Sequence, residues 1–262
     1  IFINGNNTPR LARIDLKTFR TVEILEIPNS AGNHSSPFTT ENSEYVVCGT
    51  RFSIPMKELD VPIDSYREKF NGTVSFVKVN PESGNMNVEF QIMTPPFDYD
   101  LSHAGKGPSH DWFFFSCYNT EEAYTLLEVN ASQKDKDFIM AVNWKKAEQY
   151  LKEGKAKDMA SEFYHNVYDE SKHSATSEVL KTVKMLDPKD CPDMIYYIPC
   201  PKSPHGADVD PSGEYIVGGG KLATVIPVFS FSKMIKAIET KQFDGDVAGI
   251  PVIKYEAALH GE

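Results

Sequence analysis

Two histidines occupy the same place in a stretch of sequence that occurs twice. His34 and His205 are each followed, nine or ten positions later, by the pattern Glu-Tyr-(Val/Ile)-Val-x-Gly. Imidazole is the commonest protein ligand for transition metals, copper and zinc in particular. A repeat that offers one histidine per unit can build a metal centre from several units. Alternatively, both histidines are polar residues that line a channel and bind water. These two residues alone do not distinguish a metal centre from a channel lining.

A second group of side chains offers oxygen ligands. Tyr118 and Glu121 follow the apolar run 112–117, and Asp135 and Asp137 come after a short excursion of the chain. Ca²⁺ is bound by oxygen donors of this kind, although the EF-hand pattern is missing. The alternative is a solvated acidic loop. The other histidines are predicted to be surface residues, with His103 the nearest to a strand equivalent to the one that bears His34; they are His103, His110, His165, His173 and His260.

Short β-rich runs separated by turn residues dominate the chain, so the sequence predicts an all-β fold. Helical periodicity is confined to 144–155 and 233–240, and the sequences at 80–84 and 210–213 are typical turns. The predicted strands are 13–16, 21–27, 44–48, 73–79, 88–93, 111–117, 138–143, 194–198, 214–217 and 224–231.

The repeat divides the chain into units of four strands. Residues 1–28 supply the last three strands of a first unit, 33–95 form a second, 97–200 a third with an insertion at 145–190, and 203–258 a fourth. Antiparallel four-stranded units in series are the blades of a β-propeller. We therefore expect residues 1–262 to be one domain, part of a propeller, with about three and three-quarter blades. A β-sandwich would not explain why the histidine recurs once per unit.

The propeller also predicts where the histidines lie. The first strand of each blade lines the central channel, so His34 and His205 are expected to converge at one end of it. The third unit begins with a poorer copy of the repeat that has Asp98 and Asp100 but no matching histidine. An incomplete ring leaves edge strands exposed, and we expect an isolated piece of this kind to be poorly soluble.

Composition excludes several classes of protein. There are 27 Lys+Arg against 37 Asp+Glu, a net charge of −10 without a basic run, which argues against nucleic-acid binding. The longest apolar runs are too short to cross a bilayer.

The chain starts at Ile1 inside an apolar run, so we interpret it as an internal piece, truncated at both ends, of a longer protein. Cys191 and Cys200 are a possible disulfide pair, but the spacing does not require it.

Several motifs, taken in order along nearly the whole chain, resemble the N-terminal propeller of bacterial nitrous oxide reductase. The sequence Ser-Ser-Pro-Phe after His34 and the insertion at 145–190 place the resemblance in the atypical branch of that family, which occurs in non-denitrifying bacteria. The motifs that carry it are Ile1-Phe-Ile-Asn4, Arg10-Leu-Ala-Arg-Ile-Asp-Leu, Ser116-Cys-Tyr-Asn-Thr-Glu121, Tyr197-Ile-Pro, Ser203-Pro-His-Gly206 and Gly220-Lys-Leu-Ala-Thr224.

The resemblance implies a periplasmic copper enzyme that reduces N₂O to N₂ and water as a homodimer. It implies a seven-bladed propeller whose tetranuclear, sulfide-bridged CuZ cluster is bound by seven histidines. A C-terminal cupredoxin domain with the CuA centre, absent from residues 1–262, would receive electrons from a cytochrome c or a cupredoxin. His34 and His205 match two of the seven copper ligands, whereas His260 does not match a ligand. Asp100 is a candidate for orienting a ligand or delivering protons.

The resemblance also implies a calcium site beside the cluster. Tyr118 and Glu121 match two calcium ligands, and Val129 stands where the family offers a main-chain carbonyl. If the comparison with the family is aligned on strand 138–143, the acidic ligand corresponds to Asp137. If residues are counted along the loop without an insertion, it corresponds to Asp135. We prefer Asp137. Ser203 replaces an asparagine and would bind less well unless it binds through its main chain.

Two functions remain to be distinguished. The first is a fragment of a multicopper oxidoreductase, and with two of seven ligands it would be inactive by itself. The second is a periplasmic propeller that serves as a binding scaffold without a catalytic metal, with histidines that only line the channel.

Overall fold

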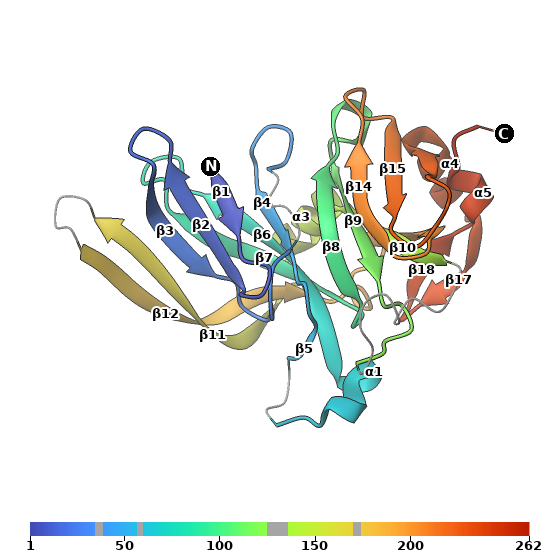
Figure 1. Ribbon diagram of the computed structural model, residues 1–262. Helices are drawn as coiled ribbons and strands as arrows, with labels where there is room; N and C mark the ends of the chain where they lie inside the picture. The colour runs from blue at the N-terminus through green and yellow to red at the C-terminus, as the bar shows by residue number, and fades with distance from the viewer. Residues whose placement is uncertain (35–38, 57–59, 125–135, 170–173, 262) are drawn as a thin grey trace.

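The computed structural model describes residues 1–34, 39–56, 60–124, 136–169 and 174–261. Most of these residues form three β-sheets, and the helices are short (Figure 1). The structure therefore confirms the all-β fold and is compatible with part of a propeller, while the number of blades stays a prediction. Among the described residues, no helix is both long enough and apolar enough to cross a membrane.

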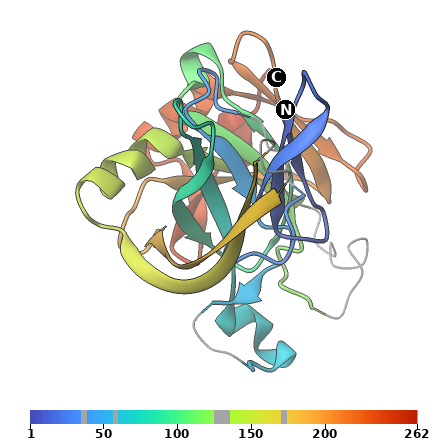
Figure 2. The same ribbon diagram turned by 90° about the vertical axis from the view of Figure 1, so that its left-hand side faces the viewer.

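The first sheet joins the first two predicted units through a long hairpin. The strands of the first unit, β1–β3, and those of the second, β4, β6 and β7, pair in the expected antiparallel manner. Between them lies the hairpin β11–β12, which comes from the insertion and pairs with β3 on one side and β7 on the other (Figure 2). The strands are β1 (Phe2–Asn4), β2 (Arg10–Asp15), β3 (Arg20–Glu26), β4 (Val46–Gly49), β5 (Ile54–Pro55), β6 (Phe70–Val79), β7 (Met86–Thr94), β11 (Lys157–Asp169) and β12 (Ser174–Leu186).

The second and third sheets contain the third and fourth predicted units. The order β8-β9-β10-β13 is that of a four-stranded blade, and β14-β15-β16 gives three strands of the next. The strands are β8 (Asp98–Ala104), β9 (Trp112–Tyr118), β10 (Lys136–Asn143), β13 (Ile195–Pro201), β14 (Pro204–Val209), β15 (Tyr215–Gly220), β16 (Val228–Ser230), β17 (Phe243–Val247) and β18 (Ile250–Ile253).

The end of the fourth unit differs from the expectation. Residues 203–258 were predicted to complete a blade, but β18 pairs in parallel with β13 at Tyr197 and Val252, so β17 and β18 extend the third unit's sheet instead. Ile250 and Ile253 are buried there. Burial of these apolar side chains against the third unit explains the pairing, because a strand lies where its apolar face is covered.

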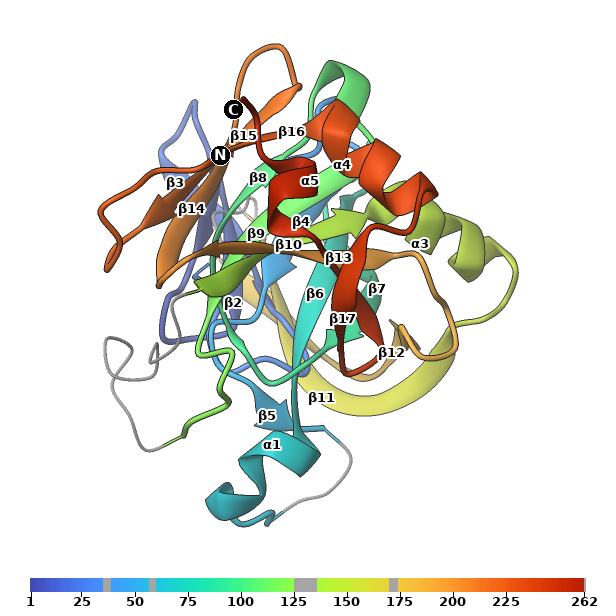
Figure 3. The same ribbon diagram turned by 90° about the vertical axis from the view of Figure 1, so that its right-hand side faces the viewer.

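The two longer helices lie where the periodicity predicted them. Helix α3 (Trp144–Lys152) is capped by Asn143, whose Oδ1 accepts a hydrogen bond from the main-chain nitrogen of Lys146. Helix α4 (Phe231–Glu239) is capped by Ser230 in the same way, and it lies with α5 (Tyr255–Ala258) beside the second sheet (Figure 3). The remaining helical turns are α1 (Tyr66–Lys69) and the 3₁₀ turns Ile63–Ser65 and Gly107–Ser109.

The second sheet is apolar on both faces. Successive side chains of a strand point to opposite faces, and on β9 Phe113 and Phe115 enter one core while Trp112 and Phe114 enter another. The strands β10 and β13 divide their side chains between the same two cores. Because both faces of the sheet are buried, β9 reads as a continuous apolar run instead of an alternating one. The sheets therefore stack face to face, as neighbouring propeller blades do.

The four cysteines are free and buried, so Cys191 and Cys200 do not form a disulfide. The two belong to different cores, Cys191 to the one between the first and second sheets and Cys200 to the one on the other face of the second sheet. Their thiols add to the apolar packing, in line with the usual behaviour of buried cysteine.

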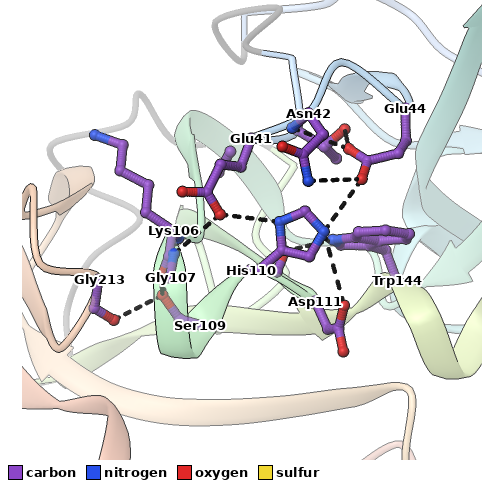
Figure 4. A network of polar contacts seen from close by, with 12 residues as sticks. Glu41, Asn42, Glu44, Lys106, Gly107, Ser109, His110, Asp111, Trp144 and Gly213 are labelled. Atoms are coloured by element: carbon purple, nitrogen blue, oxygen red, sulfur yellow. Dashed lines mark hydrogen bonds and ion pairs between the residues drawn. The ribbon is translucent and has the colours of Figure 1, made fainter.

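His110 joins the second and third units (Figure 4). Its Nδ1 lies 3.0 Å from Oε2 of Glu41 and its Nε2 lies 3.1 Å from Oε1 of Glu44. On the other side of the same loop, the hydroxyl of Ser109 donates a hydrogen bond of 2.7 Å to the carbonyl oxygen of Gly213 in the fourth unit. The turn before β4, the turn after β8 and the turn after β14 are thus tied together by polar contacts.

His165 is not the surface residue that the sequence predicted. It is 9% exposed, and its Nε2 contacts Oε1 of Glu23, which is 1% exposed. Glu23 also accepts hydrogen bonds of 2.9 Å from Nε of Arg13 and of 2.7 Å from the main-chain nitrogen of Met86. The prediction failed because the pairing of β11 with β3 buries this histidine, and that pairing joins residues 142 positions apart.

We expect Glu23→Ala to loosen the β11–β12 hairpin. The buried Glu23 carboxylate pairs with Arg13 and contacts His165 of β11. Removing one partner of a buried charged pair costs about 3–5 kcal/mol. The amide hydrogens of β11 and β12 should therefore exchange at least about 100-fold faster. Hydrogen exchange of the full-length protein, resolved by peptide, measures this effect. The matched control is Glu26→Ala on the same strand, where the pair with Arg10 is exposed and worth less than about 1 kcal/mol. Equal exchange in the two variants would contradict the role of Glu23.

A pH dependence follows from Glu44. Burial opposes its ionisation, but the hydrogen bond from Thr40, a main-chain hydrogen bond, the charge of His110 and the hydrogen bond from Asn42 together outweigh burial and hold the pKa of Glu44 below its ordinary value of 4.5. The ionised side chain therefore stabilises the fold above about pH 4.5, and this contribution is lost as the pH falls through the lowered pKa.

The variant Glu44→Gln tests this dependence. We expect it to lower the free energy of unfolding by about 1 kcal/mol between about pH 5 and 7, because Glu44 is a third exposed. The difference from the wild type should shrink below about pH 4, as the wild-type carboxylate is protonated. Denaturant midpoints of the full-length protein at each pH provide the measurement, with the exposed Glu239→Gln as control. A difference that grows on acidification would contradict the sign.

Candidate metal centre

Three potential metal ligands from different units meet at one place. His34 lies ahead of β4 in the second unit, Asp100 lies on β8, and His205 lies on β14. One ligand atom of each lies within 4.8 Å of the others, and the ring centroids of the two histidines are 6.0 Å apart. The structure thus brings together the two histidines that the repeat singled out, and it adds the carboxylate of the unit that has no matching histidine.

Asp100 is the centre of this cluster. It is fully buried, one carboxylate oxygen contacts Nδ1 of His34, and the other lies 3.5 Å from Nε2 of His205. The side chains of the histidines are 30% and 39% exposed, so the cluster is open on one side. The third neighbour is Lys221, whose Nζ lies 3.7 Å from Oδ2 of Asp100.

Two irregularities of the strands aim these side chains. The pairing of β8 with β9 shifts between Tyr99 and Ser102, and that of β14 with β15 shifts between Pro204 and Ala207. Such bulges occur next to functional sites, where they redirect a side chain. Gly206 has a φ of +132°, a value that other residues rarely adopt, which explains the glycine after His205.

The donor set fits a transition metal. Both oxygens of Asp100 and Nδ1 of His34 are buried without a well-directed hydrogen bond; one oxygen contacts that nitrogen, and the other faces His205 and Lys221. Buried polar atoms are normally hydrogen-bonded, and a site where several are not is suited to an ion. Two converging imidazoles beside a buried carboxylate are typical of copper, zinc and iron sites, in which the carboxylate either binds the ion or orients an imidazole that does.

The residues proposed for calcium surround the end of β9. The hydroxyls of Tyr118 and Ser203 are both buried without a hydrogen-bond partner. Asp137 is 1% exposed; its Oδ1 accepts a hydrogen bond of 2.9 Å from the hydroxyl of Thr120, and its Oδ2 accepts one of 2.8 Å from the main-chain nitrogen of Ser203. Glu121 is half-buried in the turn after β9. The calcium site therefore stays a prediction, and Val129 and Asp135 lie outside the described residues.

Two cationic side chains contact the ring of Tyr118, one of the residues predicted to bind calcium. The charged groups of Arg51 and Lys221 are each 5.0 Å from the centroid of the Tyr118 ring. Burial lowers the pKa of Lys221, although the charge of Asp100 acts in the opposite direction. Burial also raises the pKa of Asp98 to about 7, against the effects of Arg51 and Asn119. No role for Arg51 or Lys221 could be predicted from the sequence, although Lys221 lies in the motif Gly220–Thr224 that contributed to the resemblance.

No family model matches the chain. Curated nitrous-oxide reductases do match it: 26% identity over 240 residues in Pseudomonas fluorescens, 23% over 235 in Stutzerimonas stutzeri and 25% over 253 in Cupriavidus necator. These alignments cover 89%, 89% and 92% of this chain, and 33%, 33% and 35% of the relatives. The chain thus spans about a third of the length of the curated relatives it matches.

Solved structures add little. A Bacteroides uniformis protein reaches a TM-score of 0.30 at 12% identity, covering 88% of this chain and 63% of its own. Hydrazine synthase from Kuenenia stuttgartiensis reaches 0.23 at 8% identity, covering 88% and 73%. Similarity at these TM-scores supports no conclusion about the fold or the function of this chain. The sequence matches instead confirm the resemblance inferred from the motifs: over about nine tenths of its length the chain is a distant relative of nitrous-oxide reductases.

Proposed function

We propose that the protein carrying this chain reduces nitrous oxide to dinitrogen and water at a copper centre to which His34 and His205 contribute ligands. The observation that carries this proposal is the meeting of these two histidines around the buried Asp100, in a chain related to nitrous-oxide reductases. Because the chain spans about a third of those relatives, the remaining copper ligands and the site of electron entry would lie outside residues 1–262.

The wider setting of the reaction belongs to the same proposal. The full-length protein would act in the periplasm as a homodimer and would receive electrons from a cytochrome c or a cupredoxin. The overall reaction consumes two electrons and two protons, breaks the N–O bond and releases N₂ and H₂O. Copper held by imidazole and sulfide would supply the electrons to the bound substrate.

The residues of this chain would fix the geometry of the centre. Asp100 contacts Nδ1 of His34, so a proton held on that nitrogen leaves the lone pair of Nε2 free to bind copper. The same carboxylate lies beside the His205 ring, so one buried group orients both ligands. Asp100 would thus act by orienting the imidazoles, whereas His34 and His205 would touch the metal themselves.

Calcium is the second ion in the proposal. Tyr118, Glu121, Asp137 and Ser203 would hold it through their oxygens, and Asp137 already ties the turn after β9 to the start of β14. Since His205 is two residues from Ser203, an ion at this place would brace the strand that carries a copper ligand.

Copper content tests the main proposal. We expect His34→Ala and His205→Ala in the full-length protein each to lower the copper retained after chelation by at least about tenfold, because a metal centre loses affinity when a ligand is removed. His260→Ala is the matched control, since His260 is exposed and outside the cluster. Metal analysis and activity with N₂O are measured together. A wild-type protein without copper, or variants that retain all of it, would favour the scaffold function over the enzyme.

Calcium content tests the second ion. Asp137→Asn should lower the bound calcium, and the variant should lose the rise in melting temperature that calcium gives the wild type, because an ion that binds the folded state stabilises it. Asp135→Asn, the alternative from counting residues, should leave both unchanged. If Asp135→Asn instead abolishes calcium binding and Asp137→Asn does not, the assignment to Asp137 is wrong.

A further inference from the structure

We infer that Lys221 is a positioning residue for the copper centre: its ammonium group holds the Asp100 carboxylate in place, and through Asp100 it orients His34 and His205. This inference rests on the proposed function, because it concerns the same copper centre. The sequence alone predicted no role for this residue.

The main chain of Lys221 is anchored beside the cluster. Its nitrogen donates a hydrogen bond of 2.8 Å to the carbonyl oxygen of Ser203, so the residue after β15 is tied to the start of β14, two positions before His205. From this anchor the side chain crosses the face of Tyr118 and ends 3.7 Å from Oδ2 of Asp100. The backbone contact and the two side-chain contacts together define where the ammonium group lies.

Electrostatics explains why a cation is placed there. A fully buried carboxylate is costly unless a positive charge compensates it. His34 and His205 do not provide that charge when they bind a metal, because imidazole binds metals in its neutral form. Lys221 supplies a positive charge to Oδ2, the oxygen that also faces His205. The opposite oxygen is then left in contact with His34.

The same side chain touches a residue proposed for the calcium site. The ammonium group of Lys221 lies over the ring of Tyr118, whose buried hydroxyl lacks a hydrogen-bond partner. Lys221 therefore spans the distance between a carboxylate that orients copper ligands and a side chain offered to calcium. One side chain thus contacts a residue of each candidate site.

The test compares variants of the full-length, copper-loaded protein. We expect Lys221→Met to lower the copper retained after chelation about tenfold, the lower end of the effect of groups that orient metal ligands. The absorption spectrum of the remaining copper should also change. Lys221→Arg should restore much of both, because it keeps the charge. If Lys221→Met does not yield soluble protein, Lys221→Gln, which has no charge and a similar length, takes its place. The matched control is Lys236→Met on the exposed side of α4.

A double variant separates positioning from a general effect on stability. If Lys221 acts through Asp100, Lys221→Met should cause no further loss of copper in a protein that already carries Asp100→Asn. Losses that multiply in the double variant would overturn the inference, as would a Lys221→Met protein with the copper content and spectrum of the Lys236→Met control.

The outcomes also distinguish the inference from the proposed function. A wild-type protein that holds no copper would overturn both. A wild-type protein that holds copper and loses it in His34→Ala, but keeps it unchanged in Lys221→Met, would overturn the role of Lys221 alone.

Discussion

The candidate site depends on one buried carboxylate and the positive or proton-bearing groups around it. Asp100 is fully buried, and its neighbours are His34, His205 and Lys221, which come from the second and fourth units while Asp100 comes from the third. Moving the buried carboxylate away from these partners would leave its charge uncompensated, which is costly, so the contacts hold Asp100 in place. The three units are therefore joined at the cluster by the same contacts that orient the imidazoles.

The rest of the fold keeps these contacts in register. Strands β9, β10 and β13 are apolar on both faces, so the second sheet is packed between two cores and has little freedom to shift. Polar contacts between successive turns, centred on His110 and Ser109, hold the other ends of the units together. The β11–β12 hairpin bridges the first and second units at their outer edges, with Glu23 and His165 at the junction. Bulges at Asp100 and His205 then turn the side chains inward from an otherwise regular scaffold.

The regular parts of the molecule could be predicted from the sequence because they follow local patterns. The ten strands that were predicted, both longer helices and the convergence of His34 with His205 follow from alternation, turn residues and the repeat. The long hairpin was not foreseen because its residues are mostly polar and its pairing joins distant segments. The buried position of His165 and the parallel pairing of β18 with β13 are likewise tertiary effects. Lys221 could not be assigned because its role depends on which residues the fold places beside it, and a single lysine carries no pattern.

The most direct test of the central claim is an X-ray structure of the full-length protein with anomalous scattering recorded on both sides of the copper absorption edge. The proposed function predicts a strong copper signal at bonding distance from Nε2 of His34 and from a ring nitrogen of His205, with Asp100 still against Nδ1 of His34. A map with no copper signal at these two histidines, in protein whose total copper content matches that of an active preparation, would contradict it.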